Sequence, residues 1–581
     1  MNIFSLIQYV LFLGIIVALV KPVGVYLERV FAGERTFIDP VMRPLERLIY
    51  RLAGVNPQQE MDWKQYAVTF LLFGFGGTLF LYLILRIQPI LHTFDPAFQP
   101  APLAPDLAIN TAISFATTTT WQAYGGETTM SYFSQIVGLA AQNFLAGAAG
   151  LVVGIAFIRG LARERTTFLG NFWVDVTRAV LWVLLPISII GSLILVWQGV
   201  PLNFNSYPTV SLLQATVDTN GNQITTQVLP MGPVAALEFI KNLGTNGGGF
   251  FNVNGVHPFA NPTPLTNLIS MLAIAILPAA LTHTFGRMVG RPRQGWVLFW
   301  VMFVLFLAGI FMSDWAEQRG NPRIAALGVD TTVSSIQAGG NMEGKETRFG
   351  IGGSVLAAVT TSNGATGSYN SMYDSYIPIG GAVVLVNMML GEIIFGGLGT
   401  GLYSIILVSL VGLFVGGLMV GRTPEYLGKK ISVNEMKLIL LYALVAPMII
   451  LPLTALAVIT APGLTALTTN SGAHGFSEIL VAYTTSMANN GLNFAGVSVN
   501  NPFYNITTAV TMWAGRFGLV VLALALAGQF VQQVHKPVTP GTMPTDTPLF
   551  AMLVIATAII VSALSYFPAL ALGPLVEHML L

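Results

Sequence analysis

Four short strings of hydroxyl, amide and small residues recur along this chain, and each follows a short apolar run. Backbone carbonyl and hydroxyl oxygens in such strings can replace the water shell of a cation, and small residues let the backbone turn its carbonyls inward. None of the strings contains a carboxylate, which divalent ions favour, so the pattern favours a dehydrated monovalent cation. The strings comprise Thr117, Thr118, Thr119 and Thr120; Gly244, Thr245, Asn246 and Gly247; Thr361, Ser362, Asn363 and Gly364; and Thr485, Ser486, Met487 and Ala488.

Taken singly, a string such as KNLGTNGGGFFN (241–252) has two other interpretations, a flexible loop and a phosphate-binding loop. The phosphate-binding loop is disfavoured because no Gly-Lys-Ser/Thr follows the glycines and no strand precedes them. Recurrence in four loops favours a filter, in which four re-entrant hairpins meet on one axis. Short Thr/Ser/Gly strings align permissively, so the residues alone leave the flexible-loop alternative open.

The elements that must position these strings are membrane helices. The 581 residues are 54% hydrophobic and 9% charged, whereas a typical soluble domain is about 25% charged. Because about 20 apolar residues cross a bilayer, the expected fold is an all-α polytopic membrane protein with about ten transmembrane helices. The predicted spans are 3–23, 64–87, 131–158, 175–197, 265–286, 294–313, 377–421, 436–460, 504–532 and 549–575. The seventh is too long for one crossing, and GEIIFGGLGTGL (391–402) interrupts it, so it is interpreted as one broken span.

The loops between the spans divide into a basic set and a set poor in cations. The basic loops and their flanking residues carry 18 of the 26 Lys and Arg residues. The positive-inside rule places the basic set in the cytoplasm, the four strings outside, and both termini outside. A net charge of +1 gives no electrostatic case for nucleic acid as a partner, and the lack of cysteine excludes disulfides and thiolate chemistry.

Four longer motifs resemble one known family, the A subunit of the Kdp potassium-transporting ATPase, and the resemblance covers essentially the whole chain. The motifs are TTTTWQAYGGET, KNLGTNGGGFFNVNGVHPFANPTPLTN, MYDSYIPIGGAVVLVNMMLGEIIFGGLGTGLY and TTSMANNGLNFAG. The resemblance implies four fused membrane–pore–membrane repeats like a potassium channel, plus one extra helix at each end. The implied units are an N-terminal span and cytoplasmic segment (1–63), pore repeats at 64–158, 175–286, 294–421 (with the broken span) and 436–532, and a C-terminal span (533–581).

The resemblance also implies a function, that of the potassium-binding and translocating subunit of an ATP-driven K⁺ import complex in the bacterial plasma (inner) membrane. The implied partners, besides the lipid bilayer, are a P-type ATPase catalytic B subunit, a C subunit and a small F subunit. K⁺ is the implied transported ion, with no covalent cofactor. The chain has no Asp-Lys-Thr-Gly phosphorylation sequence and no Walker A motif, so it is expected to be a non-hydrolytic subunit. The alternative is a stand-alone potassium channel or symporter pore without an ATPase partner.

Two departures from the family pattern concern side-chain ligands. The family often has Asn in the first string, where this chain has only threonines, and Met487 in the fourth string offers no side-chain oxygen. Carbonyl coordination is less affected, because every residue supplies a backbone carbonyl.

Ionisable residues at membrane depth are functional candidates. Glu392 lies in the broken span beside Gly396, Gly397 and Gly399, and Arg516 lies in the ninth span. The resemblance implies a gate or barrier below the filter, where a fixed cation opposes passage straight into the cytoplasm. The alternatives are a structural Glu–Arg pair, a snorkelling Arg and a plain kink.

The remaining candidates have structural interpretations. Gln122 follows the first string and is a candidate support for it, while FLAGAAGLVVG (144–154) predicts close helix packing. His257 and His474 lie in predicted outer loops and are expected to be structural or solvent-facing. No His/Asp/Glu cluster shows the sequence spacing of a transition-metal site.

Overall fold

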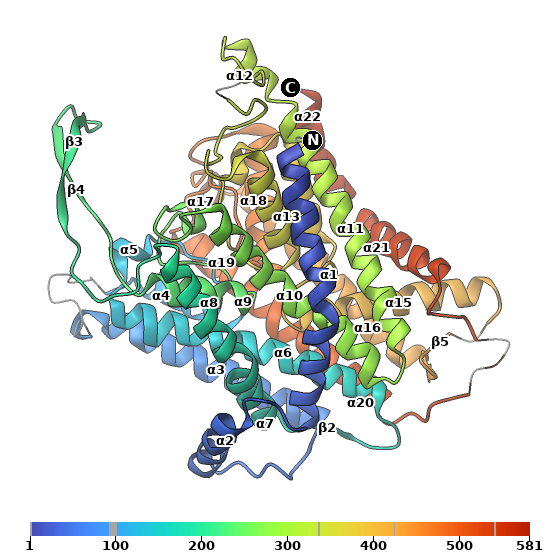
Figure 1. The fold of residues 1–581 in the computed structure, drawn as a ribbon. Coiled ribbons are helices and arrows are strands. Elements are labelled where there is room, and N and C mark those ends of the chain that lie inside the picture. The colour runs from blue at the N-terminus through green and yellow to red at the C-terminus, as the bar shows by residue number, and fades with distance from the viewer. Residues whose placement is uncertain (1–2, 92–101, 335–336, 423, 538, 540–541) are drawn as a thin grey trace.

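The computed structural model describes residues 3–91, 102–334, 337–422, 424–537, 539 and 542–581, and it is predominantly helical (Figure 1). Within those residues ten helical stretches are long and apolar enough to cross a membrane, which confirms the expected class of polytopic membrane protein. They are α1 (Ile3–Ala32), α3 (Trp63–Ile87), α6 (Ala141–Ala162), α7 (Phe172–Arg178) continued by α8 (Leu185–Trp197), α10 (Pro264–Met288), α11 (Pro292–Gln318), α15 (Thr400–Met419), α16 (Val433–Ile459), α19 (Pro502–Trp513) continued by α20 (Leu519–Phe530), and α21 (Pro548–Leu570) continued by α22 (Val576–Met579).

Several of these spans contain a π-helical turn, a feature common at functional or strained positions. The π-helical segments are Ser134–Ala140 before α6, Ala179–Leu184 between α7 and α8, Ala514–Gly518 between α19 and α20, and Ala571–Leu575 between α21 and α22. The third of these carries Arg516.

The seventh span is broken, as the sequence predicted. The half-helix α14 (Pro378–Met389) is followed by a loop over 390–399, and α15 begins at Thr400. Gly391 and Gly399 have positive φ, and so do the non-glycine residues Glu392 and Phe395. A helix cannot continue through left-handed residues, and the loop is buried in protein, where such backbone is tolerated.

Four short helices precede the polar strings, as re-entrant hairpins require. They are α4 (Pro105–Ala116), α9 (Val234–Leu243), α13 (Gly350–Asn363) and α18 (Gly472–Met487). All four are shorter than the roughly 20 residues needed to span a bilayer. Most of their side chains are buried, so these helices lie inside a shell formed by the spanning helices.

The smaller elements lie in the connecting loops. The helices are α2 (Asp39–Ala53), α5 (Gly126–Thr129), α12 (Pro322–Ala326) and α17 (Ala461–Leu464), and the antiparallel strand pairs are β1 (Met61–Asp62) with β2 (Phe168–Gly170), β3 (Thr209–Val217) with β4 (Gln223–Val228), and β5 (Glu425–Tyr426) with β6 (Lys429–Lys430). The β3–β4 hairpin projects from the helical body (Figure 1). The sequence analysis did not predict this hairpin.

The small residues of α6 allow irregular backbone, as well as neighbouring helices, to pack against this helix. A Cβ on Gly154 would lie 2.8 Å from Gly399 Cα, and one on Gly150 would lie 2.6 Å from the Leu398 carbonyl oxygen. These glycines therefore leave room for the loop of the broken span (390–399) to pack against α6. This refines the predicted role of FLAGAAGLVVG, because its partner includes irregular backbone as well as helices.

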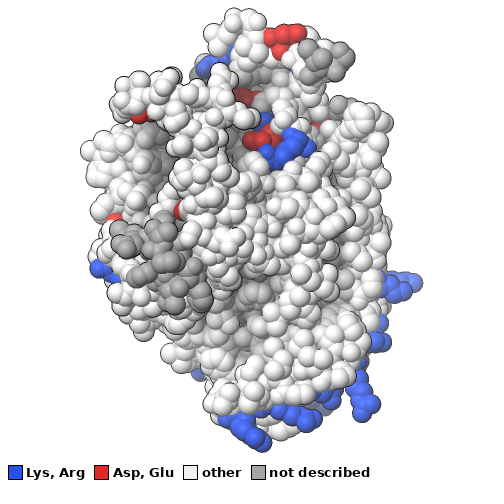
Figure 2. All heavy atoms as spheres, turned by 60° about the vertical axis from the view of Figure 1, so that its left-hand side comes forward, with Lys and Arg blue, Asp and Glu red and all other residues white. Residues whose placement is uncertain are grey.

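Charged side chains are unevenly distributed over the surface. Figure 2 shows Lys and Arg gathered towards one end of the face drawn, below a broad band that is almost free of charge. The chain begins and ends at the same end of the molecule (Figure 1), as an even number of crossings requires.

A buried ion pair holds one end of the helical body together. Arg159 on α6 forms two bonds with Asp175 on α7, Nη1 to Oδ2 at 2.6 Å and Nη2 to Oδ1 at 2.9 Å. Arg159 also donates to the carbonyl oxygens of Phe31 and Leu169, and the Tyr66 hydroxyl donates to Asp175. The pair thereby connects α1, α3, α6 and α7.

Replacing Asp175 by Asn is expected to lower stability by about 3–5 kcal/mol, because the buried Arg159 charge loses its counterion. Glu60→Gln is the matched control, since Glu60 pairs with Arg163 at an exposed site and such pairs contribute about 1 kcal/mol or less. Thermal unfolding in detergent would measure both variants. Equal losses of stability in the two variants would contradict the assignment of the Arg159–Asp175 pair as a main stabilising contact between these helices.

Candidate functional site

The four polar strings converge on one buried location, where each backbone turns out of its helix through a left-handed residue. The residues with positive φ are Thr118 (65°), Thr245 (49°), Ala365 (49°) and Asn489 (51°). All four line the same cavity, of about 130 Å³. Left-handed conformations are unfavourable for non-glycine residues, so their recurrence at matching places identifies a constrained site.

The structure corrects the alignment of the third and fourth strings. Helix α13 continues to Asn363 and α18 to Met487, so Thr361, Ser362 and Asn363, like Thr485, Ser486 and Met487, form the last helical turns. The segments that match 118–120 and 245–247 are 365–367 and 489–491, three residues later than predicted. In the first two strings the residues with positive φ, Thr118 and Thr245, fall inside the strings as defined from the sequence.

Hydroxyl hydrogen bonding is compatible with the continuation of these helices. The Ser362 hydroxyl donates to the Ala358 carbonyl at 2.6 Å, and the Ser486 hydroxyl donates to the Ala482 carbonyl at 2.7 Å. Ser and Thr can satisfy themselves in this way inside a helix. These hydroxyls are therefore engaged by their own helices rather than by a neighbouring string.

The first three segments are joined by hydrogen bonds that end on backbone carbonyl oxygens. The Thr120 hydroxyl donates to the Asn246 carbonyl at 2.6 Å. Gly247 and Gly367 form a parallel bridge, and Gly248 N–H donates to the Gly367 carbonyl at 3.2 Å. A Cβ on Gly247, which has φ of 93°, would lie 2.3 Å from Gly367 N, so only glycine permits this approach.

The fourth string closes the ring. Asn490 Nδ2 donates to the Thr361 and Ser362 carbonyls at 3.0 and 3.2 Å, and Asn489 Nδ2 donates to the Thr119 hydroxyl at 3.0 Å. A Cβ on Gly491 would lie 1.9 Å from the Thr119 carbonyl oxygen. The four segments therefore contact one another in cyclic order. We call this arrangement (118–120, 245–247, 365–367 and 489–491) the ring.

Gln122 supports the ring from outside. Its side-chain Nε2 donates to the Gly249 carbonyl at 3.1 Å, and its Oε1 accepts from Gly249 N–H at 2.8 Å. These two hydrogen bonds join the segment that follows the first string to the segment that follows the second. A support function for Gln122 remains a prediction, which these two hydrogen bonds favour.

A buried charge pair behind the second string was missed by sequence reasoning. Lys241 and Glu238, both on α9, form an ion pair at 2.7 Å and are almost fully buried. Lys241 also donates to Asn254, whose Nδ2 donates to the Gly248 carbonyl at 2.5 Å and the Gly367 carbonyl at 3.0 Å. The Asn254 amide thus connects the charged end of Lys241 to the ring. Their i, i+3 spacing was the available sequence signal.

The cavity below the ring is bounded by the broken seventh span and by Arg516. Gly397 and Leu398 line it, and Leu398 N–H donates to the Thr245 hydroxyl at 2.8 Å. A Cβ on Gly397 would lie 2.9 Å from Ala365 Cβ. The loop therefore touches two of the four strings, while Gly396 packs within the loop against the Glu392 backbone.

Arg516 and Glu392 both line this cavity, but the hydrogen bonds of Arg516 go to groups other than Glu392. Arg516 donates to the Ala146 carbonyl at 3.1 Å and to the Thr400 hydroxyl at 3.3 Å. One carboxylate oxygen of Glu392, Oε1, is buried without a hydrogen-bond partner. A direct Glu–Arg pair does not explain the two residues here, and Arg516 is buried rather than snorkelling to an interface.

The two candidate histidines have different surroundings. His257 stacks on Phe251 with ring centroids 3.7 Å apart, and burial together with the nearby Arg348 lowers the pKa of His257 to about 4. It is a neutral structural residue at ordinary pH. His474 instead meets Asp374 and Glu478 in a cluster that the sequence spacing did not indicate. Local sequence spacing could not reveal this cluster, because Asp374 lies far from His474 along the chain.

The overall fold has a counterpart among solved structures. It resembles the crystal structure of the potassium transporter TrkH from Vibrio parahaemolyticus with a TM-score of 0.50, over 88% of this chain and 98% of that chain. Sequence identity is 13%, so this likeness concerns the fold alone. Long apolar helices around four short buried helices and a buried polar ring define the class as an all-α polytopic membrane protein.

Sequence comparison identifies the family. The model of the family described as Potassium-transporting ATPase A subunit matches residues 10–579. Proteins named potassium-transporting ATPase potassium-binding subunit are 50% identical in Koribacter versatilis (98% of each chain covered), 50% identical in Sorangium cellulosum (98% of each) and 51% identical in Methylobacterium nodulans (98% of this chain, 97% of the relative). The chain belongs to the Potassium-transporting ATPase A subunit family.

Replacing Lys241 by Met is expected to lower stability by about 3–5 kcal/mol, because Glu238 is left buried without its counterion. The double variant Glu238→Gln/Lys241→Met should recover part of that loss, since the stranded charge is gone. Thermal unfolding of the variants in detergent would give the coupling energy. Additive losses would contradict a direct energetic link between the two residues.

Proposed function

We propose that this chain is the potassium-binding and translocating subunit of an ATP-driven K⁺ import complex. The observation that carries the proposal is the closed ring of four strings above a single cavity. The family and the names of the relatives support K⁺ as the transported ion.

Selectivity in the proposal comes from uncharged oxygens. The ring segments contain no Asp or Glu, and several side-chain oxygens and amides are committed to hydrogen bonds between strings. Carbonyl oxygens replace the hydration shell of K⁺, whereas Na⁺ needs a tighter cage or a stronger field. The segments 365–367 and 489–491 take the places first assigned to Thr361–Gly364 and Thr485–Ala488.

The proposed path runs from the ring into the cavity and then sideways. Straight passage is opposed by the loop over 390–399, with Gly396, Gly397 and Gly399 as its flexible positions, and by the Arg516 charge. Besides the ring, the residues that line the cavity include some from α15, α16 and α21. We propose that the ion leaves between these helices towards a P-type ATPase catalytic B subunit, with Glu392 providing a carboxylate beside the path.

The assembly and orientation complete the proposal. The C subunit and a small F subunit of the complex are further proposed partners, and ATP hydrolysis belongs to the B subunit. The protein lies in the bacterial inner membrane with both termini extracytoplasmic, since that places the basic loops inside. Units 64–158, 175–286, 294–421 and 436–532 are the four pore repeats. Co-purification with a large ATPase subunit tests this against a stand-alone channel or symporter pore.

Gly247→Asp should lower apparent K⁺ affinity and weaken discrimination against Rb⁺ or Na⁺, because a carboxylate enters a neutral ring. Gly247→Ala separates the steric effect from the charge. Gly221→Asp is the matched control, since Gly221 also has positive φ but faces open space in the β3–β4 turn. Ion competition in transport assays with the reconstituted complex is the measurement. Unchanged competition in Gly247→Asp would refute its place in a filter.

Arg516→Gln should increase ATP-independent K⁺ flux or raise the ATP consumed per K⁺, because the fixed cation below the ring is removed. Arg319→Gln is the control, since Arg319 lies over the Trp315 ring at 4.0 Å and does not line the cavity. Flux and ATP turnover in proteoliposomes measure both quantities. If neither changes, the barrier role is wrong.

A further inference from the structure

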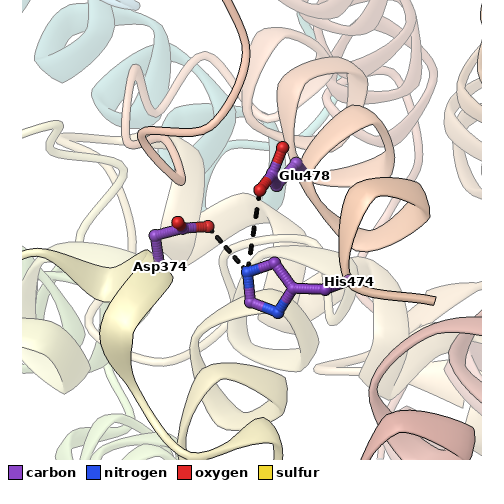
Figure 3. Close-up of side chains that lie close together, drawn as sticks. All are labelled: Asp374, His474 and Glu478. Atoms are coloured by element: carbon purple, nitrogen blue, oxygen red, sulfur yellow. Dashed lines mark hydrogen bonds and ion pairs between the residues drawn. The ribbon is translucent and has the colours of Figure 1, made fainter. Parts of the chain in front are cut away.

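A second polar site lies outside the ring and its cavity, where three separate segments meet. Asp374 follows the third string, His474 and Glu478 lie on α18, and Glu577 lies on α22. His474 Nε2 is 2.8 Å from Asp374 Oδ1 and 3.7 Å from Glu478 Oε1, as Figure 3 shows. The potential ligand atoms of Asp374, His474 and Glu478 all lie within 4.8 Å of one another.

The imidazole of His474 is oriented by a carboxylate on its far side. Its Nδ1 is 2.7 Å from Glu577 Oε1. In metal centres the ligating histidine commonly donates its other ring N–H to a carboxylate, which fixes the tautomer and turns the remaining nitrogen to the metal. Glu577 therefore directs the Nε2 atom of His474 towards Asp374 and Glu478.

The cluster carries more negative charge than its single imidazole can balance. Among the described residues, the ion pairs of Asp374, Glu478 and Glu577 all go to His474, and none goes to Lys or Arg. The Glu478 side chain is 0% exposed, and its Oε2 has no hydrogen-bond partner. A buried carboxylate oxygen left unpaired is costly, and a bound cation would remove that cost.

The surroundings hold the carboxylates in place. Asn470 Nδ2 donates to Glu478 Oε1 at 2.8 Å and to Asp374 Oδ2 at 3.3 Å. A Cβ on Gly496 would lie 2.0 Å from the Glu478 carboxylate, so glycine is needed to admit that group. Both acidic ligands are thus fixed by neighbours other than His474.

We propose that Asp374, His474 and Glu478 bind a divalent transition-metal ion of the Zn²⁺ class, with Glu577 as the residue that positions His474. One nitrogen and two carboxylate oxygens suit Zn²⁺, whereas Ca²⁺ and Mg²⁺ prefer oxygen ligands only. Zn²⁺ ligands at about 2.0–2.2 Å from the ion are separated by roughly 3.3 Å in a tetrahedron. The ion would therefore require small side-chain shifts and would tie α22, α18 and the segment after the third string together.

The test uses the full chain, stripped with a chelator and titrated with Zn²⁺ by calorimetry. One equivalent should bind and raise the unfolding temperature, and Ca²⁺ should not substitute. His474→Gln and Glu478→Gln should lose the binding, while Glu577→Gln should weaken it by about 10- to 100-fold. His578→Gln is the matched control, because His578 is an exposed histidine beside the cluster and should leave binding unchanged.

Anomalous scattering at the zinc edge from the unaltered protein provides a second measurement that does not depend on variant folding. A peak between His474 Nε2 and the two carboxylates supports the proposal. No peak there, unchanged Zn²⁺ affinity in a folded His474→Gln protein, or loss of binding only in His578→Gln would overturn it. None of these outcomes depends on K⁺ transport, so the metal site and the proposed transport function can fail separately.

Discussion

Close approach of backbone to backbone at the ring is the constraint on which the rest of the structure depends. Gly247 meets Gly367, and Gly491 meets the Thr119 carbonyl, at separations that leave no room for a Cβ. Left-handed residues turn each chain out of its helix just before these contacts. Because four segments must satisfy this geometry at once, the short helices and the spans around them serve largely to hold four turns in register.

Charge is kept near the ring but outside it. Lys241 and Glu238 neutralise each other behind the second string, and their influence reaches the ring through the neutral amide of Asn254. On the other side of the cavity, Arg516 bonds to a carbonyl and a hydroxyl. The result is a layered site, in which uncharged oxygens lie at the centre and ionised groups lie at least one side chain away.

Much of this architecture could be predicted from sequence, because spans and breaks are strong signals. The ten apolar stretches, the interruption at 391–402 and the short helices before the strings all follow from apolar length and glycine content. The register of the third and fourth strings could not be predicted. Ser362 and Ser486 look like string residues by type, yet both lie in the last turns of their helices, where their hydroxyls bond to the preceding helical turn. The Asp374–His474 contact depends on tertiary packing, which no local pattern encodes.

The hydrogen bond from Leu398 N–H to the Thr245 hydroxyl joins the interrupted span directly to the second string. Such a bond contributes on the order of 1 kcal/mol, and it breaks if the loop withdraws from beneath the ring. Whatever stabilises Thr245 in its present rotamer therefore also stabilises the loop, and the reverse holds by thermodynamic reciprocity. In the proposed function, ion binding at the ring and the position of this loop are therefore thermodynamically linked.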